Sequence, residues 1–252
     1  MGAHAVHVWV ERAWGAVEME ATRDGDVVLD SVFVAESPKL LELMEGIGTA
    51  PALPDRPGVY GYVSESELPF AERVTMGLIV PEAYAGAGRR AARIPGQSGA
   101  ASRAVGLELA LWDRHLTTFA TVDDPPHSAE AYVAGPAALL IAKAHKVHER
   151  ALQVHTRPDR LRPKDSGDIA LLMMVASPFD VADTLATNIE DHPEIEQAVS
   201  DGARYLIERY QPKDSIVRFH AADALAARFD EATVHEAVDT WITAFSQSWL
   251  GR

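Results

Sequence analysis

The chain has 252 residues, of which 47% are hydrophobic and 24% are charged, and it contains no cysteine. These values are typical of a globular protein large enough for one big domain or two small ones. The lack of cysteine excludes disulfides, thiolate zinc sites and cysteine nucleophiles. No apolar run has the length of a membrane span and no signal peptide is recognised, so we expect a cytoplasmic protein with no membrane partner.

The formal net charge of −14 argues against non-specific binding of nucleic acid by the whole surface. The positive charges are nevertheless clustered. Residues 86–103 contain four arginines and no acid, and residues 143–164 contain seven lysines or arginines and two acids. Local clusters of this kind on an acidic protein favour a specific anionic ligand.

The first half of the chain mixes helical and strand patterns. Apolar spacing predicts a helix over 4–14, and a strand that starts at Asp26 and extends toward Val34. Ser37 and Pro38 predict the N-cap of a second helix, which ends at Gly48. A proline-rich loop is expected at 49–58, strands at 59–63 and 74–80, a long loop at 81–103 and an alternating strand at 105–112.

From Pro136 the pattern is helical to the end of the chain. Helices are expected over 136–155, 165–176, and about 180–190, 193–210 and 217–247. The predicted fold class is therefore α+β. An α+β domain with a small mixed sheet would occupy residues 1–133, and an all-helical domain would occupy residues 134–252.

Two aspartates at the start of the first strand carry the most informative chemistry. Asp24 and Asp26 are separated by one glycine, so in a strand both carboxylates face the same side, roughly 7 Å apart at Cα. Such a pair suits Mg²⁺ that is shared with substrate phosphates. The alternative is a tight turn, because Asp-Gly is a strong turn dipeptide, and for these residues alone a turn is the commoner outcome.

Other features point to an anionic ligand, each with a simpler alternative. Gly2 and Ala3 begin a helix, whose free N–H groups favour a phosphate, although for these residues alone a frayed terminus is the better explanation. Lys143, Lys146 and Arg150 share one face of the long central helix and could bind a triphosphate. A stripe of charges is, however, more often a solvated helix face.

The next helix begins with Lys-Asp-Ser-Gly-Asp at residues 164–168. Lys164 could reach the ligand, whereas Asp165 is explained more simply as an N-cap, and the role of Asp168 stays open.

Two further motifs are weaker. Residues 86–91 loosely match a dinucleotide-binding fingerprint, but Pro95 and the glycines after it prevent the helix that this motif must open. His145 and His148 form half of a zinc site without a third ligand, and a surface pair on a helix is the better interpretation.

The chain contains, in order, GAHAV, TRDGD with VVLD, LIVPE, GLELAL, AGPAALLIAKAHKVHER and RPKDSGDIALLM, all within residues 2–176. This ordered set resembles the AbiEii-type minimal nucleotidyltransferases of bacterial toxin–antitoxin and phage-defence systems, and more narrowly an actinobacterial branch of them. The resemblance implies a nucleotidyltransferase-like small mixed sheet with flanking helices, followed by a helical domain that closes over the nucleotide.

The resemblance also implies an activity. Members of such families transfer a nucleotide from an NTP to an RNA end, such as tRNA, or to a protein hydroxyl, with Mg²⁺ at the reacting phosphate. The catalytic and metal-binding pair would be Asp24 and Asp26. The nucleotide-binding set would be Gly2, Ala3, Lys143, Lys146, Arg150, Lys164 and Asp168. An antitoxin would be a further expected partner.

Two departures from the family pattern favour an alternative. The family's third carboxylate corresponds to Gly77 in MGLIVPE, and Glu108 on a neighbouring predicted strand is a candidate substitute. The family also places a strand and a helix before its glycine pair, so we expect either an upstream start or a missing strand. The alternative function is a non-catalytic nucleotide- or partner-binding protein on the same fold.

Overall fold

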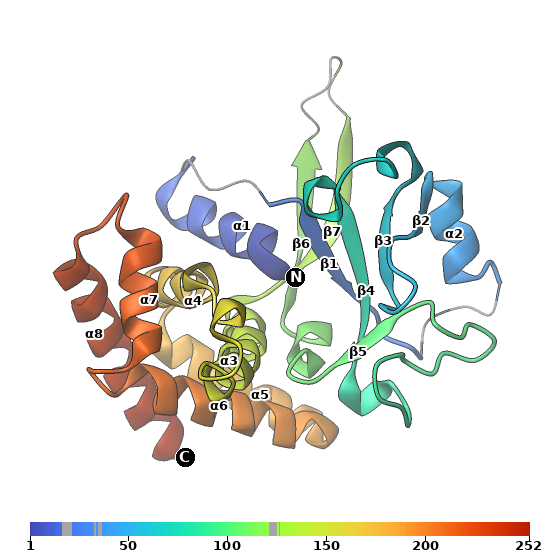
Figure 1. Cartoon of the computed structure of the whole chain (residues 1–252). Helices are drawn as coiled ribbons and strands as arrows, with labels where there is room; N and C mark the ends of the chain where they lie inside the picture. Colours follow the sequence, from blue (N-terminus) through green and yellow to red (C-terminus); the bar gives the residue numbers. More distant parts are fainter. Residues whose placement is uncertain (17–21, 33, 35–36, 121–124, 126) are drawn as a thin grey trace.

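The computed structural model describes residues 1–252 apart from 17–21, 33, 35–36, 121–124 and 126. Its described part has a β-rich region beside a helical region, and the N-terminus lies where the two meet (Figure 1). The predicted α+β class is therefore confirmed.

A small mixed sheet is built around one central strand. Strands β1 and β5 run parallel to β4, whereas β3 is antiparallel to β4 and β2 is antiparallel to β3. The bounds are β1 Asp24–Val28, β2 Thr49–Pro51, β3 Val59–Tyr62, β4 Thr75–Pro81 and β5 Ser102–Ala104. The register places Asp26 of β1 opposite Gly77 of β4.

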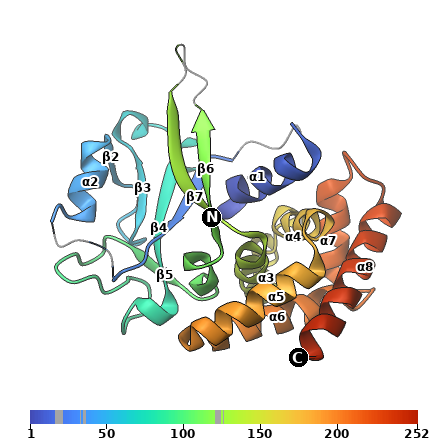
Figure 2. The ribbon, with the colours of Figure 1, turned by 180° about the vertical axis from the view of Figure 1, so that it is seen from behind.

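The helical region follows a separate two-stranded hairpin that projects from the molecule (Figure 1). The hairpin strands are β6 Arg114–Ala120 and β7 Ser128–Ala134. The helices are α1 Gly2–Trp14, α2 Leu40–Gly46, α3 Pro136–Leu152, α4 Pro163–Val175, α5 Pro178–Asp191, α6 Glu196–Tyr210, α7 Ile216–Leu225 and α8 Glu231–Leu250. Seen from behind, α3 and α4 lie next to the β-rich region and α8 lies at the outer edge (Figure 2).

Helix α1 joins the two regions, although it is separated from the other core helices by more than a hundred residues. Its apolar side chains Ala5, Val6 and Val10 belong to the large core formed mainly by α3–α8. A smaller core, formed by the sheet, α2 and the loop after β4, includes Tyr60 and Val80. Because α1 packs on β1 as well as on α3 and α4, it fixes the start of β1 against the helical region.

The start of α3 is held by the hairpin base. Asp113 Oδ2 accepts a hydrogen bond of 2.8 Å from the Ala138 N–H, and the Gly135 N–H donates to the Asp113 carbonyl. A Cβ atom at residue 135 would lie 1.8 Å from Asp113 Oδ1, so only glycine permits this approach. The first N–H groups of a helix have no partner within the helix, and the Asp113 carboxylate satisfies the one at Ala138.

Several sequence-based expectations were wrong. Strand β1 ends at Val28 instead of extending toward Val34, and the N-cap of α2 is Lys39, whose N–H donates to the Glu42 carboxylate at 3.0 Å. Residues 49–51 form β2 within the expected loop, and the expected helix over 217–247 is two helices, α7 and α8.

Residues 105–112 do not form the expected strand. Instead, residues 108–111 form a 3-10 helix in which all four residues are buried. Because no face is exposed, the alternation of apolar and polar residues does not indicate a strand here.

No single helix in the described part of the chain has the length and apolar composition of a membrane span. The bent pair 158–175 and 178–191 passes that test only when its two halves are taken together, across an angle of 101°.

Candidate functional site

The carboxylate of Asp26 lies between two glycines from different elements. A Cβ atom at Gly77 of β4 would be 2.6 Å from Asp26 Oδ1, and one at Gly2 of α1 would be 3.4 Å from Asp26 Oδ2. Gly2 has a φ of +80°, which disfavours any other residue there. The structure therefore brings the predicted helix-start glycine and the predicted metal-binding aspartate together.

The first turn of α1 has no side-chain cap and contains no acid. The Met1 amino group donates a hydrogen bond of 2.9 Å to the Asp26 carbonyl, which ties the turn to β1. Ala3 follows in the same turn and is half-buried. Uncapped N–H groups together with the helix dipole make such a turn suitable for an anion.

The two aspartates have opposite pKa shifts. Burial raises the pKa of Asp26, and the charge of Asp24 acts in the same direction, whereas the Met1 amino group, Lys146 and Lys143 oppose them. A hydrogen bond from the Thr22 hydroxyl lowers the pKa of Asp24. Since α3 lysines act on Asp26, the acid pair and the basic face of α3 share one electrostatic environment.

The basic face of α3 is paired with the start of α4. Lys143 Nζ lies 2.7 Å from Asp168 Oδ2, and both side chains are buried. Lys146 Nζ lies 2.7 Å from Asp165 Oδ1, and the Arg150 guanidinium binds the other oxygen of Asp165. The solvated-face interpretation of this stripe is therefore wrong for Lys143.

The N-cap interpretation of Asp165 is also wrong. The N-cap of α4 is Arg162, and Asp165 is a buried residue within the first turn. A buried carboxylate requires compensation, which here comes from two cations on a different helix. The sequence indicated acids at a helix start but not that their partners lie on α3.

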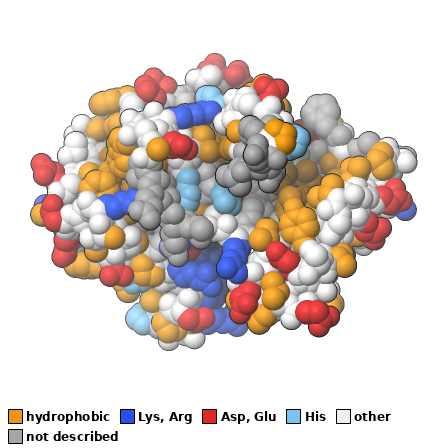
Figure 3. Space-filling view, turned by 90° about the horizontal axis from the view of Figure 1, so that it is seen from above, with side chains coloured by type: hydrophobic (Ala, Val, Ile, Leu, Met, Phe, Trp, Pro, Cys, Tyr) orange, Lys and Arg blue, Asp and Glu red, His pale blue; other side chains and the backbone are white. Residues whose placement is uncertain are grey.

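Four cations lie where α3 meets α4, namely Lys143, Lys146, Arg150 and Lys164. The first three are bound by the two acids of α4, Asp165 and Asp168. The charge of Lys164 also lowers the pKa of Asp24. Seen from above, Lys and Arg side chains gather beside His side chains near the middle of the face, while most acidic side chains lie toward its margin (Figure 3).

A cavity of about 640 Å³ opens next to this cluster and contains two residues that sequence analysis missed. His7 of α1 and Arg228, which follows α7, line it together with Lys164 and Asp168. Arg228 lies in a segment without any motif, so no sequence signal could have identified it. His7 could have been noticed because it follows Gly2 on the same short helix.

The donor set fits one divalent cation better than two. Asp24 and Asp26 are two residues apart in β1, so their side chains leave the same face of the strand. Two carboxylates are the usual protein contribution to a Mg²⁺ that also binds phosphates. Across the described ranges, no three His, Asp or Glu residues lie close enough to form a metal site. Gly77, which is the register partner of Asp26 on β4, adds no carboxylate to this pair.

Glu108 was expected on a strand next to the acid pair, as a substitute for the third carboxylate. That expectation is wrong, because Glu108 does not lie on a strand. It is buried in the 3-10 helix, where Oε1 accepts a long hydrogen bond of 3.4 Å from the Ala83 N–H. Within the described residues its Oε2 atom has no hydrogen-bond partner.

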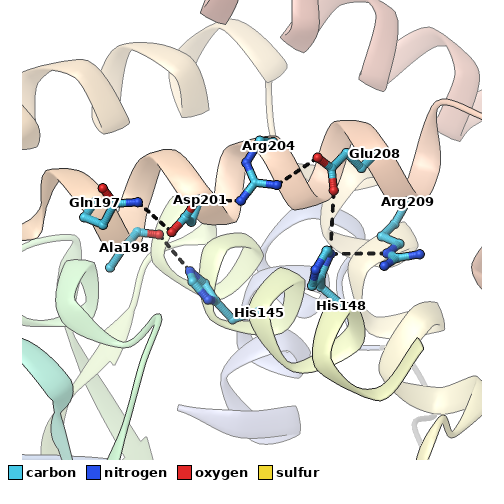
Figure 4. A network of polar contacts seen from close by, with 8 residues as sticks. All are labelled: His145, His148, Gln197, Ala198, Asp201, Arg204, Glu208 and Arg209. Carbon is cyan, nitrogen blue, oxygen red and sulfur yellow. Dashed lines mark hydrogen bonds and ion pairs between the residues drawn. The ribbon is translucent and has the colours of Figure 1, made fainter. Parts of the chain in front are cut away.

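His145 and His148 connect α3 to α6 (Figure 4). His145 Nε2 lies 2.7 Å from the Ala198 carbonyl, and His148 Nδ1 accepts a hydrogen bond of 3.3 Å from Arg209. Burial and the Arg209 charge lower the pKa of His148, which keeps its ring neutral and able to accept. The ring also stacks on Tyr205. Both histidines are thus helix–helix contacts, and His145 is buried, not on the surface.

The arginine-rich segment 86–103 is not part of this site. Arg103 binds Glu82 at 2.7 Å and donates to the carbonyls of Gly86 and Gly88, so it fixes the loop after β4. Residues 86–91 form no helix, in agreement with the rejection of the dinucleotide fingerprint.

Comparison with known proteins finds no matching family model, no matching curated protein and no matching solved structure. Functional assignment therefore depends on the residues and their geometry.

Replacing Asp26 by asparagine is expected to stabilise the protein in Mg²⁺-free buffer. Because the folded-state pKa of Asp26 is raised, its ionised form opposes folding at neutral pH, and this penalty disappears as the pH falls through that pKa. We expect a Tm increase of about 2–4 °C at neutral pH, corresponding to about 1 kcal/mol. Thermal unfolding at neutral and acidic pH measures it. An equal Tm difference at both pH values would contradict the raised pKa of Asp26 in the folded state.

Proposed function

We propose that this protein binds a nucleoside triphosphate with Mg²⁺ as an AbiEii-type nucleotidyltransferase does, and transfers a nucleotide to an RNA or protein acceptor. The observation that carries the proposal is the position of Asp26. Its carboxylate lies against the uncapped first turn of α1, and the charges of Lys143 and Lys146 act on it. The order of the sequence motifs supports the same function.

The chain's own residues would bind and orient the nucleotide. N–H groups of the turn at Gly2 and Ala3 suit a phosphate. Lys164 and Lys146, whose side chain is 44% exposed, would neutralise the pyrophosphate that leaves. Lys146 also binds Asp165. Lys143 and Arg150 would contribute mainly by holding α4 in place, since each is bound to an acid of that helix and their side chains are only 8% and 21% exposed.

Magnesium would be held by Asp24 and Asp26. When bound, it neutralises phosphate oxygens and stabilises the charge that develops during transfer. Two carboxylates suit one such ion together with phosphate oxygens. The residues do not fit a second ion, because Gly77 supplies no oxygen at the neighbouring position. An antitoxin partner and a cytoplasmic location are expectations from the family resemblance and from composition.

A second candidate function is non-catalytic binding of a nucleotide or a partner. The observation that favours it is the contact at Gly77, where even a Cβ atom would lie 2.6 Å from Asp26 Oδ1. Any side chain there would have to displace the Asp26 carboxylate. The site therefore has no room for a third carboxylate at position 77. The loss of that carboxylate would reduce catalysis and leave nucleotide binding intact.

Labelled-NTP transfer to a tRNA pool separates the two candidates. With Mg²⁺ present, we expect Asp26→Asn to lower transfer by at least about 100-fold, since even changes outside the first ligand shell lower metal affinity or activity about 10–100-fold. The wild-type rate should also fall as the pH decreases through the raised pKa of Asp26, because Mg²⁺ binds the ionised carboxylate.

Binding of the same labelled NTPs, measured by equilibrium dialysis, is the control. A wild-type protein that binds NTP with Mg²⁺ but transfers nothing would support the second candidate. A protein that neither binds nor transfers would contradict both.

A further inference from the structure

The cavity next to the Lys143–Asp168 ion pair has walls from three helices. His7 comes from α1, Lys164, Asp168 and Leu171 come from α4, and Leu225 ends α7. At Gly167 a Cβ atom would lie 2.7 Å from the Ala224 side chain, so glycine lets α7 close tightly against α4 and form the back wall. The result is a recess with a buried apolar wall and polar groups on the remaining sides.

The recess shares residues with the proposed phosphate-binding region. Asp168 lines it, and its partner Lys143 acts on Asp26. Lys164 also lines it and acts on Asp24. A ligand that places phosphates at the first turn of α1 would therefore extend its remaining part along α1 into the recess.

The chemistry of the walls suits a planar heteroaromatic group. Leu171 and Leu225 provide buried apolar surface. Burial lowers the pKa of His7, so its ring is neutral near neutral pH and offers one hydrogen-bond donor and one acceptor. Arg228 is exposed at the rim, and its side chain makes no hydrogen bond or ion pair within the described part of the chain. A guanidinium stacks readily on a base.

We infer that this recess holds the nucleoside part of the nucleotide, with His7 and Arg228 in contact with the base. The inference rests on the proposed nucleotide binding, and it adds two residues that set affinity for the base as opposed to the phosphates. Neither residue belongs to the motifs that the chain shares with the family.

Two probes separate base contacts from phosphate contacts. The first probe is an NTP, and all four NTPs are tested in turn with Mg²⁺. The second probe is inorganic tripolyphosphate with Mg²⁺, because tripolyphosphate lacks a nucleoside. Isothermal titration calorimetry is to be carried out on the full chain, with His7→Ala and Arg228→Gln. Arg89→Gln and His155→Ala, at exposed positions outside the recess, are matched controls.

We expect each recess variant to raise the Kd of the preferred NTP by about tenfold, within the range found when a stacking partner of a base is removed. The Kd of tripolyphosphate should not change, and neither control should alter either value. Arg228 is exposed, so Arg228→Gln tests the inference even where His7→Ala lowers stability.

Three results would count against the proposals. Unchanged NTP affinity in both recess variants, with the wild type still binding both probes, would overturn the inference and leave the proposed function standing. Equal loss of affinity for both probes would also overturn it, because the residues would then act on the phosphates. Failure of the wild type to bind either probe would overturn the proposed function itself.

Discussion

Replacing Lys143 by methionine is expected to destabilise the protein by about 3–5 kcal/mol, because the Asp168 carboxylate would remain buried without its partner. The two side chains are only 8% and 7% exposed, and their charged atoms are 2.7 Å apart. Water therefore cannot replace the lost ammonium group. Urea unfolding measures the effect as a lower midpoint with an unchanged m-value.

The double variant Lys143→Met/Asp168→Leu is the matched control. A buried ion pair that is replaced as a whole by apolar residues is often neutral in stability, so most of the loss should be recovered. Lys146→Met should cost less than about 1 kcal/mol, since this lysine is 44% exposed and Arg150 still compensates Asp165. A loss as large for Lys146→Met as for Lys143→Met would contradict this division.

These differences within one stripe show what the sequence could and could not predict. Spacing placed Lys143, Lys146 and Arg150 on one face of α3, and the structure agrees. Spacing carries no information about the opposing surface, so Asp165 was interpreted as a cap and the role of Asp168 was left open. Ion-pair partners depend on how two helices pack, which is a property of tertiary structure.

The acid pair was predicted for a better physical reason. Alternation along a strand is a local rule, and β1 starts at Asp24 as a strand instead of a turn. The same rule failed at residues 105–112, where helix α3 and its neighbours cover residues 108–111 on all sides. Alternation indicates a strand only where one face is solvated. The β6–β7 hairpin was missed because its exposed positions lack a clear apolar face.

Position 77 offers the most direct test of how the acid site is organised. We expect Gly77→Asp to make the stability of the protein depend on Mg²⁺. Residue 77 is the register partner of Asp26, and its Cβ atom would be 2.6 Å from Asp26 Oδ1. In EDTA, a third carboxylate would repel the buried Asp26 and force it to rotate, which should lower the free energy of unfolding by about 1–3 kcal/mol.

Magnesium should reverse this loss, because three carboxylates bind the ion more tightly than two. At a Mg²⁺ concentration 100 times the Kd, binding to the folded state alone adds about 2.7 kcal/mol. Gly77→Asn has the same shape without the charge, so it should be destabilised equally with EDTA and with Mg²⁺. Thermal unfolding of both variants in the two buffers measures the difference. If Gly77→Asp and Gly77→Asn respond alike to Mg²⁺, the side chain at position 77 does not face a cation held by Asp26, and the carboxylates of β1 have some role other than metal binding.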